Sequence, residues 1–203
     1  MDTLLTLVIA MGGIATGIGA IWTATLARRQ LLEQRRFLSE QTERARLTLE
    51  YDLLTRMVDR FVGPHLLSMR RATAKYLLDN DFFEDNDGRM GMPSLNSTAV
   101  EVCAFFEEVG EMLKLGVLRD DLVWTRFSVL GQAYWLLCKP GIERMRQEWQ
   151  DPAMFVEYEY LCRRMAETDR EQGSAIPITQ ERLRQTMERE AVRGEESPTT
   201  TTE

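Results

Sequence analysis

The sequence is poor in the side chains that most often hold metals or carry out catalysis. It contains one histidine, His65, and three cysteines, Cys103, Cys138 and Cys162, none of them in a CxxC spacing. A zinc site or a Ser-His or Cys-His pair would need partners that these residues lack. The sequence also has no GxxxxGK[ST] phosphate loop. We therefore predict no metal, no cofactor and no enzymatic activity, and we expect the cysteines to be buried apolar residues in a reducing compartment.

The chain has no excess of basic charge. The chain carries 25 Lys and Arg against 32 Asp and Glu, a net charge of −7. Proteins that bind duplex DNA or RNA use clusters of Lys and Arg against the phosphates. The acidic balance argues against nucleic acid as a partner, and 203 residues leave room for one globular domain with appendages.

Charged residues are absent from Thr3 to Ala27. This run has about 25 positions, and a helix that spans a bilayer needs about 20. The alternative is a cleaved signal peptide, which would need a basic n-region and a small-x-small cleavage site. Met1-Asp2-Thr3 holds no basic residue, and Ala27 is followed at once by Arg28. We expect residues 1–27 to be a retained transmembrane anchor.

Basic residues follow this run but do not precede it. They are Arg28, Arg29, Arg35 and Arg36. The flank richer in Lys and Arg stays in the cytoplasm, so these arginines determine the predicted topology. The sequence predicts a single-pass protein of the inner (plasma) membrane, with its N-terminus outside and its C-terminal domain in the cytoplasm.

Small residues recur every four positions within the predicted span. The candidate face for helix packing comprises Gly12, Gly13, Gly17 and Ala20. Small side chains at this spacing allow close helix approach, which would support a homodimer through the membrane helix. The alternative is that a membrane helix simply tolerates these glycines.

The remaining sequence has the periodicity of helices. Residues 28–60 are rich in helix formers and predict a helical connector, in which Leu31, Leu38 and Ala45 only weakly specify a coiled coil. Gly63-Pro64 predicts a helix break. Since no window alternates with period two, we expect an all-α fold in which the membrane helix continues into a helical bundle at 61–172.

Further signals mark helix ends within that domain. Thr98 and Glu101 form a candidate capping box, and Pro140-Gly141 predicts a kink or break. Trp135 lies among leucines and is expected to be buried. The composition of residues 173–203 predicts a polar, mostly disordered tail. Within it, Thr179 is expected to cap a short helix.

An acidic run at 79–88 suggests a calcium loop. Ligand spacing in EF-hands would require an oxygen ligand at Phe83 and a glutamate at Ser94 when Gly88 takes the turn position, so the register fails. A solvated loop is the favoured interpretation, and whether the run binds an ion stays open.

Three segments resemble a known family. They are FFEEVGEMLKLGVLRDDLVWTRF, YWLLCKPGIERMRQEW and DPAMFVEYEYLCRRM. They are similar to an uncharacterised bacterial family of one-pass membrane proteins with a cytosolic helical domain. The resemblance implies that topology and fold, and brings no reaction, ligand or catalytic residue.

The predicted function is a membrane-tethered binding or scaffolding protein with an unknown protein partner. The alternatives are a sensory or regulatory subunit of a larger membrane complex and, third, an enzyme of unrecognised type.

Overall fold

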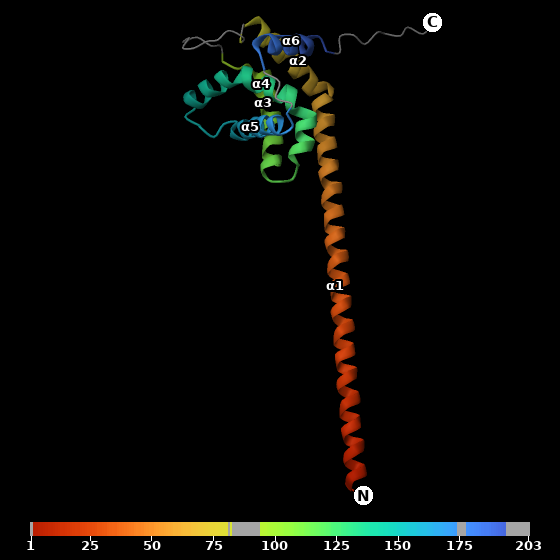
Figure 1. The fold of residues 1–203 in the computed structure, drawn as a ribbon. Coiled ribbons are helices and arrows are strands. Elements are labelled where there is room, and N and C mark those ends of the chain that lie inside the picture. The colour runs from red at the N-terminus through yellow and green to blue at the C-terminus, as the bar shows by residue number, and fades with distance from the viewer. Residues whose placement is uncertain (1, 81, 83–93, 174–177, 194–203) are drawn as a thin grey trace, which may run out of the picture. The chain divides into compact units, whose positions relative to one another are not determined.

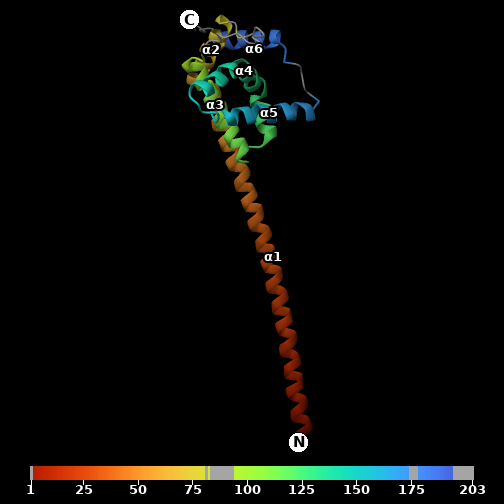
Figure 2. The same ribbon diagram turned by 90° about the vertical axis from the view of Figure 1, so that its left-hand side faces the viewer.

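The computed structural model describes residues 2–80, 82, 94–173 and 178–193, and in its first helix the side chains from residue 28 onward. These residues form six α-helices and no strand (Figures 1 and 2). The prediction of an all-α fold is confirmed. The chain divides into two compact units, residues 1–51 and 52–203.

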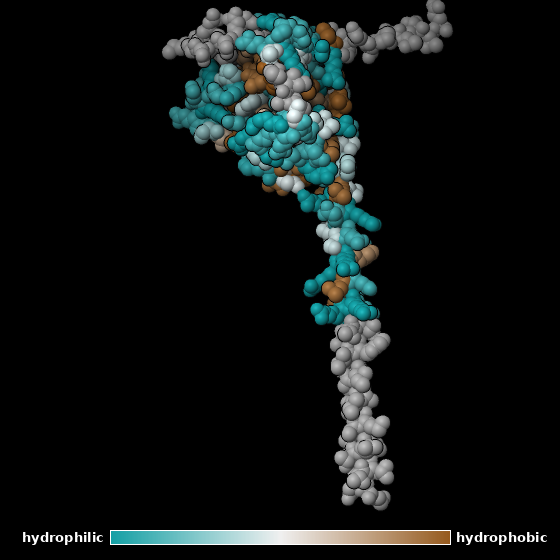
Figure 3. Space-filling view, viewed as in Figure 1, coloured by the Kyte–Doolittle hydropathy of each residue, from teal (hydrophilic) through white to brown (hydrophobic). Residues whose placement is uncertain are grey.

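Helix α1, Asp2–Val62, runs through both units. In the first unit, Arg28, Arg29, Arg35 and Arg36 are all exposed. Figure 3 shows mainly hydrophilic residues along the described part of this unit, with a few hydrophobic ones among them. Helix α1 covers residues 28–60, so the predicted helical connector is present. Leu31 and Leu38 are 59% and 60% exposed, and the coiled coil stays a prediction.

The predicted membrane span at residues 3–27 falls where no side chains are described. Over the residues that the structure does describe, no helix is long and apolar enough to cross a membrane. Gly12, Gly13, Gly17 and Ala20 also lie outside the described side chains.

The second unit is a bundle built on a shared aromatic core. Its later helices are α2 (Pro64–Asp79), α3 (Ser97–Lys114), α4 (Asp120–Glu148), α5 (Val156–Glu171) and α6 (Gln180–Val192). Helix α3 packs mainly on α5, and α2 mainly on α6 (Figures 1 and 2). Phe61, from the end of α1, stacks on Phe105 with centroids 5.2 Å apart and meets Phe127 edge to face at 5.4 Å. This unit begins at Asp52, earlier than the predicted boundary at residue 61.

Trp135 lies inside this core, as predicted. It is 8% exposed, and its ring meets Tyr158 edge to face with centroids 5.1 Å apart. The three cysteines are buried and free, which confirms that they are structural apolar residues.

Several helix ends agree with the sequence, and one predicted cap does not. Helix α1 ends before Gly63-Pro64, as predicted. The capping box at Thr98 is wrong, because the cap of α3 is Asn96, whose side chain accepts a hydrogen bond from the backbone N of Ala99 at 2.8 Å. Asparagine caps helices as well as threonine does, and here it lies two residues earlier.

Of the kink or break predicted at Pro140-Gly141, the break does not occur: helix α4 runs through Pro140. It continues to Glu148, because its second half is held by tertiary packing: Ile142 and Met145 are buried. A Cβ at Gly141 would lie 2.7 Å from Cγ of Leu95, so the chain packs closely at this point. Burial outweighs the lost proline hydrogen bond.

The short helix predicted after Thr179 is present as α6, Gln180–Val192, but the sequence did not predict that it docks on the bundle. Thr179 caps this helix, as predicted, by accepting a hydrogen bond from the N of Arg182 at 3.3 Å. Leu183, Met187 and Ala191 recur every four residues and are buried. This narrow stripe is enough to dock a helix whose other faces are polar.

The segment FFEEVG forms the junction between α3 and α5. Glu107 accepts a hydrogen bond from the backbone N of Tyr158 at 2.6 Å, and so satisfies a free N–H at the start of α5. A Cβ on Gly110 would lie 2.1 Å from the carbonyl O of Glu157, so the two helices approach more closely than any larger residue would allow. Burial raises the pKa of Glu107. The residues that carry the family resemblance here are therefore structural.

Candidate functional site

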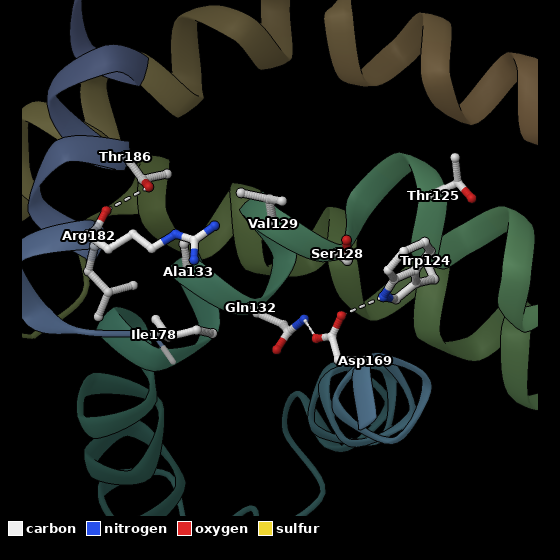
Figure 4. A pocket seen from close by; sticks show the side chains of 11 residues that line it. Trp124, Thr125, Ser128, Val129, Gln132, Ala133, Asp169, Ile178, Arg182 and Thr186 are labelled. Atoms are coloured by element: carbon white, nitrogen blue, oxygen red, sulfur yellow. Dashed lines mark hydrogen bonds between the residues drawn. The ribbon is translucent and has the colours of Figure 1, made fainter. Parts of the chain in front are cut away.

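A pocket of about 390 Å³ opens between α4, α5 and α6 (Figure 4). We call it the α4–α5–α6 pocket. Apolar side chains from two helices line it, among them Val129 and Ala133 of α4 and Leu183 of α6. Its volume falls in the range of small-molecule sites, which are mainly apolar with a few polar groups that set orientation.

Asp169 of α5 is held on one side of this pocket. Its Oδ1 accepts a hydrogen bond from Nε1 of Trp124 at 2.7 Å, and its Oδ2 accepts one from Nε2 of Gln132 at 2.8 Å. Both donors come from α4 and lie on either side of Asp169 (Figure 4). The carboxylate therefore joins α4 to α5 and fixes the orientation of the Trp124 indole.

Arg182 enters the pocket from α6. Figure 4 shows its guanidinium pointing inward, on the side opposite the contact between Asp169 and Trp124. The residue is half-buried, and its backbone N and O are used by Thr179 and Thr186 at the first turns of α6. The pocket thus has a cationic side and, across from it, an aromatic side.

A buried ion pair sets the position of α6. Arg70 of α2 is fully buried, and its Nη2 donates to Oε2 of Glu190. Its Nη1 donates to the carbonyl O of Phe61 at 2.9 Å, and its guanidinium carbon lies 3.9 Å from the Phe61 ring centroid. The hydroxyl of Tyr134 donates to the carbonyl O of Arg70 at 3.0 Å, and burial raises the pKa of Tyr134.

These contacts link α1, α2, α4 and α6 around one buried cation. Leaving such a buried cation unpaired strongly destabilises the fold, so the ion pair holds α6 in a defined position against α2. The α6 wall of the pocket is consequently fixed relative to α4.

The single histidine has an acidic partner, and the cysteines lie buried in the core. Nε2 of His65 lies 2.5 Å from Oε1 of Glu101, at an exposed position between α2 and α3. Cys103 is buried, and a hydrogen bond to Cys138 together with burial raises the pKa of its thiol. Burial likewise raises the pKa of Cys162. These pKa shifts disfavour the reactive thiolate.

The other residues singled out in the sequence are the topology arginines and the acidic run. The four arginines predicted to set the topology are exposed on α1 and are not among the residues that line the pocket. Most of the acidic run at 79–88 lies outside the described residues. Within the described ranges, no group of His, Cys, Asp and Glu is arranged to hold a metal ion.

No local pattern in the sequence indicates the pocket directly. Trp124 and Gln132 lie eight residues apart on α4, and Asp169 follows 45 residues after Trp124. The usable signal was the stripe of Leu183, Met187 and Ala191, which indicates a docked helix. Even so, a stripe does not tell which helices it will cover.

Comparison with known proteins places the chain in a family. The family described as Domain of unknown function (DUF4760) matches residues 7–165. Because this is most of the chain, the protein belongs to that family. No curated protein and no protein of solved structure matches the chain. The matched range ends within α5, so Asp169 and the α6 wall of the pocket lie beyond it.

Proposed function

We propose that this member of the DUF4760 family is a membrane-tethered binding protein. Its N-terminal segment would span the bacterial inner membrane once, and its helical domain would hold a protein partner in the cytoplasm. The observation that carries the tether is the uncharged run from Thr3 to Ala27, which precedes exposed arginines on one unbroken helix, Asp2–Val62. A hydrophobic run of this length suits a bilayer.

The orientation is supported by where the arginines occur. Arg28 and Arg29 follow the run directly, and the only charged residue before it is Asp2. Moving several arginines across a membrane is unfavourable, so the basic flank stays inside. Fusions of alkaline phosphatase and of a fluorescent protein at the C-terminus test this. We expect fluorescence without phosphatase activity, and phosphatase activity would contradict the proposed topology.

Binding of a protein partner is supported by the surface of the domain. Trp149, at the C-terminal end of α4, is 66% exposed. Exposed tryptophans are costly to leave in water and are enriched among the residues that contribute most to protein interfaces. Trp149 is the best candidate for such a contact on the described surface.

The test is cross-linking in membranes followed by capture of the full chain. We expect a reproducible cross-linked partner with the wild type, and its loss with Trp149→Ala. Leu115→Ala is the matched control, because Leu115 is also strongly exposed, at 70%, and lies on the loop after α3. Equal recovery with the wild type and both variants would contradict a role for Trp149. Recovery of no partner would contradict the binding function.

A sensory or regulatory subunit is the second candidate, and the α4–α5–α6 pocket favours it. A pocket of about 390 Å³ between a family segment and a docked C-terminal helix could couple a ligand to the position of that helix. Such a subunit would change its partner contact when the pocket is filled, whereas a pure scaffold would not.

A further inference from the structure

We propose that the α4–α5–α6 pocket binds a small monocarboxylate with an apolar body, and that the guanidinium of Arg182 pairs with its carboxylate. The proposal adds a small-molecule ligand to the tethered binding function and does not depend on the tether or on a protein partner.

The charge of the ligand is inferred from Arg182. Its guanidinium points into the pocket from α6 (Figure 4). Among the residues that the structure describes, no ion pair involves this guanidinium, although Arg193 on the same helix pairs with Glu190 at 3.0 Å. A half-buried cation without a counter-charge is unfavourable. A ligand carboxylate would supply two parallel N–H···O bonds to the planar fork of arginine.

The far side of the pocket limits the ligand to one negative charge. Asp169 lies there, with its oxygens already bonded to Trp124 at 2.7 Å and Gln132 at 2.8 Å. A second carboxylate or a phosphate reaching this side would face Asp169 and be repelled. An ammonium group would meet a carboxylate that is already satisfied on both oxygens, and its approach would face the positive charge of Arg182.

The body of the ligand is inferred from the walls between these two sides. Val129, Ala133 and Leu183 supply aliphatic surface, and the Trp124 indole supplies an aromatic face. The volume of about 390 Å³ is at the lower end of small-molecule pockets. An alkyl or phenyl group attached to a carboxylate by a short chain satisfies the charge, the apolar walls and the size.

The test is isothermal titration calorimetry of the full chain in non-ionic detergent, with three probes of nearly equal shape. They are 3-phenylpropionate, 3-phenylpropan-1-ol and 3-phenylpropylamine. We expect saturable binding of the acid, binding of the alcohol at least about tenfold weaker, and no binding of the amine, because only the acid gains the charge-assisted bonds. Acid and alcohol of equal affinity, tighter binding of the amine, or no binding of the acid up to its solubility limit would overturn the proposal.

Variants assign the contact to Arg182. Arg182→Met keeps the aliphatic stem and should weaken binding of the acid about tenfold to hundredfold. Arg126→Met is the matched control: it removes the same charge from an exposed position on α4 outside the pocket, and should bind like the wild type. Unchanged acid binding by Arg182→Met would overturn the assignment.

A second variant keeps the test decisive if Arg182→Met does not fold. Val129 is 63% exposed at the pocket, so Val129→Trp leaves the core intact and places an indole in the opening. With a far-UV circular dichroism spectrum like that of the wild type, it should lose most of the affinity for 3-phenylpropionate. Retained affinity would show that the acid binds elsewhere and would overturn the proposal. Failure of these probes would leave the cross-linking result of the tethered protein unaffected, so the two proposals fail separately.

Discussion

Replacing Gly110 by alanine tests the closest approach in the domain. The new Cβ would lie 2.1 Å from the carbonyl O and 2.6 Å from the carbonyl C of Glu157. An ordinary carbon to oxygen contact is about 3.3 Å, so α3 and α5 would have to separate locally by about 1 Å. The obstacle is backbone, which cannot rotate aside as a side chain can.

The cost follows from two opposing terms. Overpacking of a well-packed interior lowers the free energy of unfolding by about 1 to 3 kcal/mol. For Gly110→Ala we expect a value at the upper end of this range, because the obstacle is backbone. Alanine recovers about 1 kcal/mol, because glycine is the poorer helix former. The variant should therefore lose about 2 kcal/mol of stability. For a domain of this size, the melting temperature should fall by about 4 to 8 °C.

Gly131→Ala is the matched control for this change. Gly131 also lies within a helix, but its added Cβ would be 3.3 Å from Cε1 of Phe106 and 3.5 Å from Sδ of Met165. The flexible methionine can move aside, so the gain in helix propensity should roughly offset the crowding. We expect stability within about 1 kcal/mol of the wild type.

The assay is urea unfolding of the full chain in detergent, followed by tryptophan fluorescence. The wild type and Gly131→Ala should unfold at similar urea concentrations, and Gly110→Ala should unfold at a clearly lower one. If Gly110→Ala unfolds at the same urea concentration as the wild type, or at a higher one, the close contact of α3 with α5 at Glu157 is refuted.

Three other changes test the core and its charges. Glu190→Ala should cost about 3 to 5 kcal/mol by leaving the buried Arg70 cation unpaired, measured by urea unfolding, whereas an unchanged midpoint would mean that α6 is not docked. Trp135→Ala should cost about 3 to 5 kcal/mol and lower the melting temperature, and an unchanged melting temperature would refute its burial. Burial raises the folded pKa of Glu107, so its contribution favours folding at low pH and is lost as the pH rises through that pKa. Glu107→Gln should flatten this part of the pH profile of stability, and an unaltered profile would contradict the raised pKa.

Helix content and several helix ends were predictable because their causes are local. The break at Gly63-Pro64 depends on proline, which lacks an N–H, and the cap at Thr179 on a hydroxyl within reach of the next turn. Burial of Trp135 followed from its apolar neighbours and its size. Each of these needs only a few adjacent residues.

Two details of the helices were not decided by the local sequence pattern. Thr98 had the right pattern for a cap, but Asn96 was nearer the point where the loop enters α3. At Pro140-Gly141 the sequence allowed a kink or a break, and α4 does not break there, where Gly141 packs against Leu95. At Pro140 a contact with a segment from elsewhere in the chain outweighed the local preference.

What the sequence determined by itself is therefore the helical class, the position of several helix ends, the inert character of the cysteines and the uncharged run at 3–27. All follow from composition and from spacing along the chain. The tertiary structure alone decided that α6 belongs to the bundle, since Glu190 pairs with Arg70, which lies 120 residues earlier in the chain. It also decided the pocket, because Trp124 and Arg182 come together only after α4 and α6 are packed. Contacts between distant segments depend on how apolar faces pair in three dimensions, and no local pattern specifies that pairing.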